Sequence, residues 1–446
     1  MQVVTLEIPE LGNHTHLVHD GRQALVVDPS RDIAPVEAAA ERAGVEIAAV
    51  ADTHIHNDYV SGALGLARRH GADYLLSADE PVQFERVGVR DGDLLTVGRL
   101  EVTVLATPGH TRHHQAFAVR DPEGSGPDAL LSGGSLLHGT VGRTDLVDPR
   151  LRHDLARAQW ASARALARLD PATRLLPTHG FGSFCAGGDA TTGTDGSLGA
   201  ELLTNPALTQ ERDRFVADLV AGFGPVPAYY GHMAPLNRAG AGRAVPRPGR
   251  PVTRDQVTDA ILAGQWVVDL RQRASFARGH VAGSVNVEYS SQFATYVGWL
   301  VPWADDLVLL YDTADDVGSA LHDLAAIGID GPGIHDLGPT STLAASFRRT
   351  DWAGFRSHSG PRVVVDVRDQ DEYESGHLPD AVHLPVHEVD RRGADLPAGE
   401  LWVHCRSGYR AGIAASLLHR SGRSVVHVDD SWDQVSELAI ATTVAA

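Results

Sequence analysis

Short apolar runs that end in polar turns follow one another through the first half of the chain. They are rich in Val, Leu and Ala and end at Gly, Ser, Thr or Asp, over residues 24–32, 47–58, 72–79, 100–111, 129–136 and 174–180. Runs of this kind predict β-strands, whereas residues 151–169 predict a helix. The pattern therefore predicts a layered α/β protein whose polar loops gather at one edge.

The second half of the chain contains an internal repeat. Residues 267–287 match residues 364–384 at an offset of 97, and residues 307–328 match residues 401–422 at an offset of 94. Each copy reads strand, loop, strand, loop, helix, which predicts a parallel sheet with functional loops at the C-terminal ends of its strands. We therefore expect two small α/β domains in tandem.

A change in composition separates the two halves. Residues 238–251 are rich in Arg, Gly and Pro and lack a hydrophobic period, so they read as a linker. A length of 446 residues suggests about three domains. The expected division is a first domain at 1–237, the linker, and further domains at 252–350 and 355–446.

The charge balance is strongly acidic. The chain has 38 basic and 57 acidic residues, a net charge of −19, and every one of its basic residues is Arg. The absence of lysine excludes a P-loop lysine, a Schiff-base lysine and a lysine general base. The negative charge argues against nucleic acid and against an anionic membrane surface as partners.

The N-terminal residues show no basic segment followed by an apolar run, and no stretch approaches the roughly 20 apolar residues that span a bilayer. Two cysteines, Cys185 and Cys405, do not make a disulfide framework. We expect a cytoplasmic protein without membrane attachment, and a homodimer is one candidate assembly.

Histidines gather where three predicted strands end. The segment after residue 52 carries His54, His56 and Asp58, and His110 and His179 each follow another apolar strand. Imidazole and carboxylate groups are the donors that zinc and iron prefer, so these five residues predict a metal site. Abundance alone accounts for four further histidines, which we leave outside the site: His113, His114, His138 and His153.

These histidines lie in motifs that resemble a known family. THIHND (53–58), PGHT (108–111), GRTD (142–145) and THGFGS (178–183) are similar to motifs of the metallo-β-lactamase fold, in the branch that holds glyoxalase II and the persulfide dioxygenases. The resemblance covers about residues 1–235 and implies an αββα sandwich. Tyr59 stands where glyoxalase II-like enzymes have a histidine of their two-metal site, which favours the dioxygenase side.

The resemblance to persulfide dioxygenases implies one Fe(II) ion held by His54, His110 and an aspartate, with Zn(II) as the alternative metal. In this chain the aspartate position falls on Gly134, which has no side chain to donate. Three outcomes follow from this departure: weak binding of iron with water in the third place, a different metal site completed by His56, Asp58 or His179, or a domain that serves as a scaffold. We expect metal to be retained, and Arg143 and Tyr230 to contact substrate.

A second candidate site is the loop Cys405–Arg410, between a predicted strand and a predicted helix. Backbone N–H groups at a helix N-terminus, together with Arg406 and Arg410, predict a reactive thiolate in an anion-binding loop. The spacing is Cys-x4-Arg, whereas tyrosine phosphatases use Cys-x5-Arg. The shorter loop between the cysteine and the arginine suits a sulfur atom better than a phosphate group. Cys185, by contrast, is expected to be a small buried residue.

This loop, with Asp366-Val367-Arg368 and the segment 374–379, resembles a rhodanese domain. The resemblance implies sulfur transfer through a persulfide on Cys405, with Arg410 positioning an anionic donor and Arg406 assisting. We expect Asp366 and Arg368 to form a structural ion pair. In the middle copy Tyr311 replaces Cys405 and Asp316 replaces Arg410, so we expect an inactive rhodanese-like copy used for packing.

The sequence thus predicts an N-terminal metallo-β-lactamase αββα sandwich followed by two rhodanese-like α/β domains. We expect a sulfur-metabolism enzyme that oxidises a low-molecular-weight thiol persulfide, such as glutathione persulfide, to sulfite. Cys405 would exchange sulfur with thiosulfate or another sulfur donor. Two alternatives stay open: a zinc-dependent thioester hydrolase joined to a rhodanese, and a metal domain that serves only as a binding platform.

Overall fold

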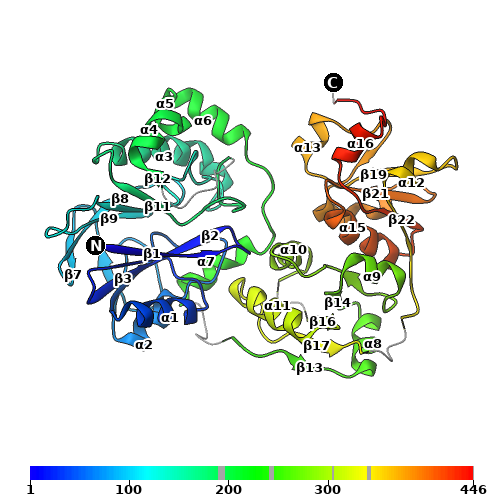
Figure 1. Ribbon diagram of the computed structural model, residues 1–446, viewed down its shortest axis with the longest axis horizontal. Helices are drawn as coiled ribbons and strands as arrows, with labels where there is room; N and C mark the ends of the chain where they lie inside the picture. The colour runs from blue at the N-terminus through cyan, green and yellow to red at the C-terminus, as the bar shows by residue number, and fades with distance from the viewer. Residues whose placement is uncertain (189–195, 241–245, 304–305, 339–342, 445–446) are drawn as a thin grey trace. The chain divides into compact units, whose positions relative to one another are not determined.

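The computed structural model describes residues 1–188, 196–240, 246–303, 306–338 and 343–444 (Figure 1). The chain divides into two compact units: the first holds Met1–Pro246 with His322–Ile329, and the second holds Arg247–Leu321 with Asp330–Ala446. The division at Pro246 falls within the predicted linker 238–251, of which residues 241–245 lie outside the described residues.

The first unit contains two six-stranded sheets. One has the order β1 (Gln2–Ile8), β2 (Asn13–His19), β3 (Gln23–Val27), β4 (Glu46–Ala51), β5 (Asp73–Ser77) and β6 (Val87–Val89). The other has the order β12 (Gly196–Ser197), β11 (Arg174–Pro177), β10 (Ala129–Gly133), β9 (Gln115–Arg120), β8 (Leu100–Ala106) and β7 (Leu94–Val97).

The two sheets pack face to face because apolar side chains alternate along their strands. On β3, Leu25 and Val27 point into a core shared with Val104 and Phe117 of the second sheet, while Val26 joins a separate core with α1 (Ala34–Ala43) and α2 (Ala63–His70). The outer face of the second sheet is covered by α3 (Arg152–Leu166), α5 (Pro206–Thr209) and α6 (Arg212–Ala221). The predicted αββα sandwich is confirmed.

The remaining helices of this unit are α4 (Leu198–Thr204) and α7 (Tyr230–Arg238), and a short 3₁₀ turn, η1 (Pro149–Leu151), precedes α3. The candidate metal ligands follow the ends of three strands, as the sequence predicts. His54 comes after β4, His110 after β8 and His179 after β11. The three histidines therefore lie at one edge of the sandwich.

The second unit contains two five-stranded parallel sheets with the same strand order. One is β13 (Arg250–Pro251), β17 (Gly333–Asp336), β16 (Leu307–Tyr311), β14 (Trp266–Asp269) and β15 (Val285–Asn286). The other is β18 (Arg348–Thr350), β22 (Val425–Val428), β21 (Leu401–His404), β19 (Val363–Asp366) and β20 (Val382–His383). The internal repeat of the sequence is thus a repeat of topology as well.

Helices surround these two sheets (Figure 1). The first copy has α8 (Arg254–Leu262), α9 (Arg273–Arg278), α10 (Phe293–Leu300) and α11 (Ala314–Ala326), whose last residues are counted with the first unit. The second copy has α12 (Trp352–Ser357), α13 (Gln370–Ser375), α14 (Val389–Arg392), α15 (Tyr409–Arg420), α16 (Asp433–Glu437) and the 3₁₀ turns η2 (Val386–Glu388) and η3 (Gly393–Asp395).

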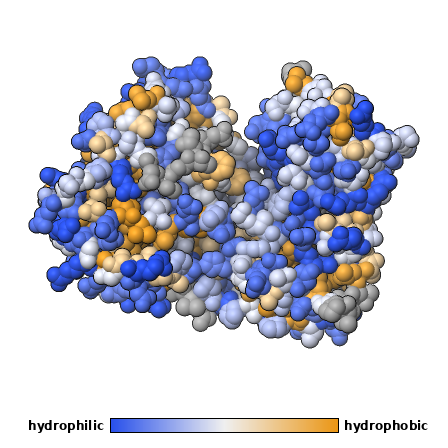
Figure 2. Space-filling view, viewed as in Figure 1, coloured by the Kyte–Doolittle hydropathy of each residue, from blue (hydrophilic) through white to orange (hydrophobic). Residues whose placement is uncertain are grey.

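The surface in one view is mainly polar. Figure 2 shows a face on which polar residues prevail and apolar residues form separate patches. Among the described residues, no helix combines the length and the apolar character needed to cross a membrane.

Both copies in the second unit carry the same buried ion pair. Arg368 Nη2 lies 2.6 Å from Asp366 Oδ2 and Arg271 Nη2 lies 2.7 Å from Asp269 Oδ2, and each guanidinium also donates to a carbonyl oxygen at the next helix end, that of Gly376 or Gly279. Because the copy without a cysteine keeps the pair, its role is structural, as predicted for Asp366 and Arg368.

We predict that Asp366→Asn lowers the free energy of unfolding of the second unit by about 3–5 kcal/mol, because it leaves the buried Arg368 charge without its partner. Urea unfolding followed by tryptophan fluorescence measures this. Asp390→Asn, which breaks an exposed pair with Arg420, is the control and should change stability by at most about 1 kcal/mol. Equal effects of the two substitutions would contradict the structural role.

Candidate metal centre and nucleophilic loop

Three buried histidines from three different loops form the centre of the first unit. His54, His110 and His179 are fully buried, and each offers a nitrogen within 4.8 Å of those of the other two. Their ring centroids lie 4.8 Å apart for His54 and His110, 5.1 Å for His110 and His179, and 5.5 Å for His54 and His179. The predicted convergence of these loops is present in the structure.

Hydrogen bonds fix the same nitrogen of each ring. His110 Nδ1 donates to the carbonyl oxygen of Arg143 (2.7 Å), and His179 Nδ1 donates to Asn13 Oδ1 (2.9 Å). The Thr53 hydroxyl donates to Asp28 Oδ2 and therefore accepts from His54 Nδ1 at 2.9 Å. Each ring thus carries its proton on Nδ1, which leaves the lone pair on Nε2.

The Nε2 atoms of the same three rings make no hydrogen bond. Within the described residues none of them has a hydrogen-bond partner, although all three are buried. Burial and the neighbouring imidazoles hold the pKa of His54 well below its usual value and lower that of His110 to about 3, so both rings are neutral. Neutral imidazoles with a hydrogen-bonded Nδ1 and a free Nε2 are what a first-row metal ion requires.

Gly134 contributes no donor to this centre, as its residue type predicts. A β-carbon at this position would lie 2.4 Å from His110 Cδ2, so the His110 ring occupies the space that a longer side chain would enter. The Gly134 amide donates to Nε2 of His114 (2.9 Å), and Gln159 Nε2 donates to the Gly134 carbonyl oxygen at 3.0 Å. The backbone here is fixed around His110 and not around a carboxylate.

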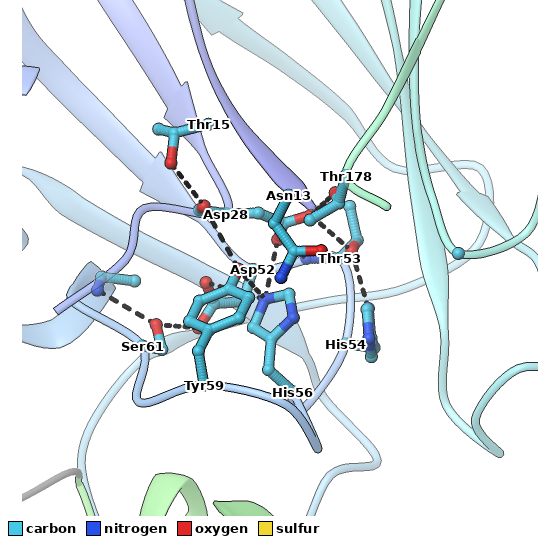
Figure 3. Close-up of polar contacts among 12 residues, drawn as sticks. Asn13, Thr15, Asp28, Asp52, Thr53, His54, His56, Tyr59, Ser61 and Thr178 are labelled. Atoms are coloured by element: carbon cyan, nitrogen blue, oxygen red, sulfur yellow. Dashed lines mark hydrogen bonds and ion pairs between the residues drawn. The ribbon is translucent and has the colours of Figure 1, made fainter. Parts of the chain in front are cut away.

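The Nε2 atom of His56 is directed at two carboxylates and not at the three-histidine centre. Its Nε2 lies 3.2 Å from Asp28 Oδ1, 3.6 Å from Asp52 Oδ1 and 3.0 Å from the Tyr59 hydroxyl (Figure 3). The two carboxylates outweigh the effect of burial and raise the pKa of His56 to about 10, while His56 and the donors around Asp28 lower the pKa of Asp28 to about 2. His56 is therefore a cation in a buried carboxylate pocket.

Asp58 connects to the centre through Asn13. Asn13 Nδ2 donates to Asp58 Oδ2 at 2.6 Å while Asn13 Oδ1 holds His179, and Asp58 Oδ2 itself lies 3.4 Å from His179 Nδ1. The pKa of Asp58 is lowered, chiefly by His179 acting against burial. Two further groups of donors lie close enough to share a metal ion: His56, Asp58 and His179, and Asp28, Asp52 and His56.

A cavity of about 410 Å³ adjoins the metal-ligand loops. Asn57 and Thr111, which belong to the histidine motifs, line it together with Arg112, Arg238 and Tyr230. Tyr230, for which a substrate contact is predicted, thus lines this cavity. Arg143 is instead buried, where its guanidinium pairs with Asp145 (2.7 Å) and donates to the Gly224 carbonyl oxygen.

Cys185 is fully buried, as predicted. Its Sγ lies 4.0 Å from the Tyr230 hydroxyl, and burial together with Asp58 holds the pKa of its thiol well above the usual value. A thiol in this environment is protonated and unreactive.

The second candidate site is the loop that begins at Cys405. The Gly408 amide donates to Cys405 Sγ at 3.2 Å, and Gly408 has a φ of +89°, a conformation that favours glycine. Nε2 of His427 donates to the Gly408 carbonyl oxygen at 2.8 Å. Arg406 is exposed, whereas Arg410 forms ion pairs with Asp369 and Glu372.

Several residues of these sites lack a signal in the sequence. His114, set aside as merely abundant, stacks on His54 with ring centroids 4.9 Å apart and holds Gly134. Asn13 and Asp28 lie on or after the N-terminal strands, far along the chain from the histidine motifs. The one sequence feature that could have marked Asp28 is its place directly after an apolar strand, and in the structure its φ is +54°.

Comparisons with known proteins agree with this architecture. A family model of the metallo-β-lactamase superfamily matches residues 8–179, and one of the rhodanese-like domain matches residues 350–438. The hydroxyacylglutathione hydrolases of Acidiphilium cryptum and Cereibacter sphaeroides are 33% and 32% identical to this chain over 171 and 196 residues. These matches cover 38% and 42% of this chain, and 65% and 69% of those proteins, so the chain spans just under two thirds of the first.

A solved structure extends the likeness. The crystal structure of a metallo-β-lactamase from Staphylococcus aureus is 25% identical, covers 75% of this chain and 98% of its own, and superimposes with a TM-score of 0.68. This likeness covers more of the chain than residues 8–179, the region that matches the metallo-β-lactamase superfamily model. The chain belongs to the metallo-β-lactamase superfamily through its N-terminal part and carries a rhodanese-like domain in its C-terminal part.

Proposed function

We propose that this protein oxidises a low-molecular-weight thiol persulfide to sulfite at a metal centre and transfers sulfane sulfur at Cys405. The observation that carries the proposal is the set of free Nε2 atoms of His54, His110 and His179, on a chain that also holds a cysteine in a rhodanese-like loop. Since rhodanese-like domains handle sulfane sulfur, a metal site on the same chain is best explained by a sulfur substrate. Tethering the two sites raises the effective concentration of a reactive intermediate.

The donor set fits a metal ion. His54, His110 and His179 would hold it, and the hydrogen bonds to Thr53, Arg143 and Asn13 would orient them. Fe(II) is the favoured metal because it supplies the chemistry with O₂ that oxidation of sulfur requires, with Zn(II) as the alternative. The third histidine takes the place of the carboxylate that Gly134 cannot provide.

The cavity beside the centre suits the thiol part of such a substrate. Arg112 supplies positive charge for a carboxylate, whereas Arg238 lies 3.4 Å from Glu80, which also lines the cavity, and Tyr230 supplies an aromatic wall. The names of the curated relatives, hydroxyacylglutathione hydrolases, support glutathione as the thiol. In the overall reaction one persulfide, one O₂ and one water give one thiol, one sulfite and two protons, so that the outer sulfur loses four electrons and O₂ gains them.

At Cys405 the thiolate would attack the outer sulfur of a donor. A bond from Sγ to that sulfur forms, the bond between that sulfur and the rest of the donor breaks, and the leaving group keeps the electron pair. The Gly408 amide, which already donates to Sγ, stabilises the negative charge. The middle copy would serve packing: its Arg273 pairs with Asp429, and the Glu288 carbonyl oxygen accepts from Tyr409 beside the loop.

A zinc-dependent thioester hydrolase is the second candidate, because the curated relatives are named as hydrolases of a glutathione thioester. In that case the metal supplies Lewis acidity. Gly134 and Tyr59 remove two donors that a two-metal hydrolase would use, and Tyr59 is directed at His56 instead. This is why we favour the oxidation. A domain that only binds a sulfur carrier would retain no metal.

We predict that His54→Ala, His110→Ala and His179→Ala each abolish stoichiometric metal binding, and that Asn13→Ala weakens it by about 10–100-fold because His179 loses its orientation. Elemental analysis after anaerobic reconstitution with Fe(II) or Zn(II) measures this. The exposed His153→Ala is the control and should bind metal like the natural protein. Full metal content in His179→Ala would contradict the three-histidine centre.

Oxygen uptake with glutathione persulfide tests the oxidation. The iron-loaded protein is expected to consume one O₂ for each sulfite formed, and His54→Ala is expected to show no uptake above the rate without protein. Glutathione itself should give none, since it has no outer sulfur. Hydrolysis of a glutathione thioester by the zinc-loaded protein, without oxygen uptake by the iron-loaded one, would favour the second candidate.

Sulfur transfer depends on Cys405. We predict that the intact protein gains one sulfur atom on incubation with glutathione persulfide in the absence of O₂, as measured by mass spectrometry, and that Cys405→Ala gains none. Cys185→Ala is the matched control and should load normally, because its buried thiol is protonated. Loading that survives in Cys405→Ala would exclude this residue as the acceptor.

A further inference from the structure

The Arg410 guanidinium, expected to position an anionic donor, is held by two carboxylates. Its Nη1 lies 2.7 Å from Asp369 Oδ2 and 2.6 Å from Glu372 Oε2, and its Nη2 lies 2.9 Å from Glu372 Oε1. The Arg410 side chain is 13% exposed. A two-pronged contact of this kind is geometrically demanding and persistent. We call these three residues the carboxylate clamp.

The two carboxylates of the clamp are themselves fixed by the helix that carries them. Asp369 is the N-cap of α13 and Glu372 lies three residues later, where its side chain accepts from the Asp369 amide at 3.1 Å in a capping box. The same side chain that caps the helix therefore also binds Arg410. Arg410 cannot turn toward a ligand without breaking contacts to two positioned groups.

The clamp changes the charge around Cys405. The sequence places two positive charges in the loop, Arg406 and Arg410, but the structure adds the negative charges of Asp369 and Glu372, so the four groups sum to zero. The Arg406 side chain is exposed, and within the described part of the chain its guanidinium makes no hydrogen bond or ion pair, so water screens its charge. Tyr296, which also lies near Arg410 and Cys405, is neutral because burial raises its pKa.

The internal repeat offers a comparison within the same chain. In the middle copy, Asp316 replaces Arg410, and the positions of Asp369 and Glu372 hold Gln272 and Ser275. The copy that lacks the nucleophile thus lacks all members of the clamp. The buried pair of Asp269 and Arg271, which has a structural role, is kept in that copy. The carboxylate clamp is therefore present in the copy that has the cysteine and absent from the copy that shares only its topology.

We propose that Asp369 and Glu372 set the sulfur-donor specificity of Cys405, by cancelling the charge of Arg410, so that the site takes sulfur from a thiol persulfide in preference to thiosulfate. The inference rests on the sulfur transfer proposed for Cys405. Thiosulfate is a dianion whose charge is shared by its oxygen atoms and the transferred sulfur, and it needs net positive charge to approach a thiolate. A protonated thiol persulfide is neutral at its reacting end and needs none.

The transfer step balances for the preferred donor. The Cys405 thiolate attacks the outer sulfur of R–S–SH, a bond from Sγ to that sulfur forms, and the S–S bond of the donor breaks. The thiol leaves as the thiolate RS⁻ with the electron pair, and the proton stays on the outer sulfur of Cys405. No oxidant or reductant is consumed.

The test compares two donors on the full-length protein without O₂. Rapid-quench mass spectrometry gives the second-order rate of sulfur loading on Cys405 from glutathione persulfide and from thiosulfate. In the natural protein the thiol persulfide is expected to load faster. Asp369→Asn and Glu372→Gln should each raise the ratio of the thiosulfate rate to the persulfide rate by about tenfold, because each frees one positive charge near a dianion.

Two controls separate specificity from structural damage. Glu374→Gln removes a negative charge from the same helix at a residue that bonds Gln370 instead of Arg410, and should leave the ratio unchanged. Asparagine is as good an N-cap as aspartate, so Asp369→Asn keeps α13 even if Glu372→Gln loosens it. A ratio that stays constant in both clamp variants would overturn the inference, as would faster loading from thiosulfate in the natural protein. Loading from neither donor would instead refute sulfur transfer at Cys405.

Discussion

The first unit depends on which atoms bind the ring nitrogens of its buried histidines. His54, His110 and His179 are removed from water, and hydrogen bonds satisfy only one nitrogen of each ring. A buried polar atom left without a partner costs about 1–3 kcal/mol, so three of them at one point form an expensive arrangement for a fold to keep. Neighbouring imidazoles also suppress protonation of His54 and His110, which prevents the rings from repelling one another as cations. A metal ion bound by the three Nε2 atoms would give each of them its missing partner.

The rest of the sandwich edge is arranged around this constraint. Asp28, in a left-handed backbone conformation, accepts from the Thr53 amide and hydroxyl and from Thr178, and so joins the segments that carry His54 and His179 (Figure 3). His56 supplies the positive charge that makes a buried Asp28 carboxylate tolerable. His56 therefore stabilises the centre through its charge, whereas His54 is one of the three histidines that form the centre.

Much of this was predictable from the sequence because strand periodicity and loop position are local properties. Short apolar runs specified the strands, and the histidines at their ends followed, as did the repeat in the second unit. The buried Asp366–Arg368 pair was also predictable, since its residues are two positions apart. The family comparisons agree with the metallo-β-lactamase and rhodanese-like resemblances.

What the sequence could not supply are contacts between distant segments. Asn13 orients His179 across 166 positions, and nothing local marks it. His114 follows another histidine, the half-buried His113, and nothing in the sequence distinguishes the two, but His114 is buried beside Gly134. Arg143 and Arg410 look like free cations in the sequence, whereas folding brings carboxylates to both. Side-chain charge is visible in a sequence, but its cancellation depends on the fold.

The ligand set of the metal is the central claim, and X-ray absorption at the metal edge tests it most directly. The natural protein loaded with one equivalent of Fe(II) or Zn(II) is expected to show scattering from three imidazoles, at about 2.0–2.1 Å for zinc. His179→Ala, if it holds any metal, should show two. A centre with two imidazoles and a protein carboxylate in the natural protein would contradict the account, because it would mean that another residue, and not His179, replaces the donor missing at Gly134.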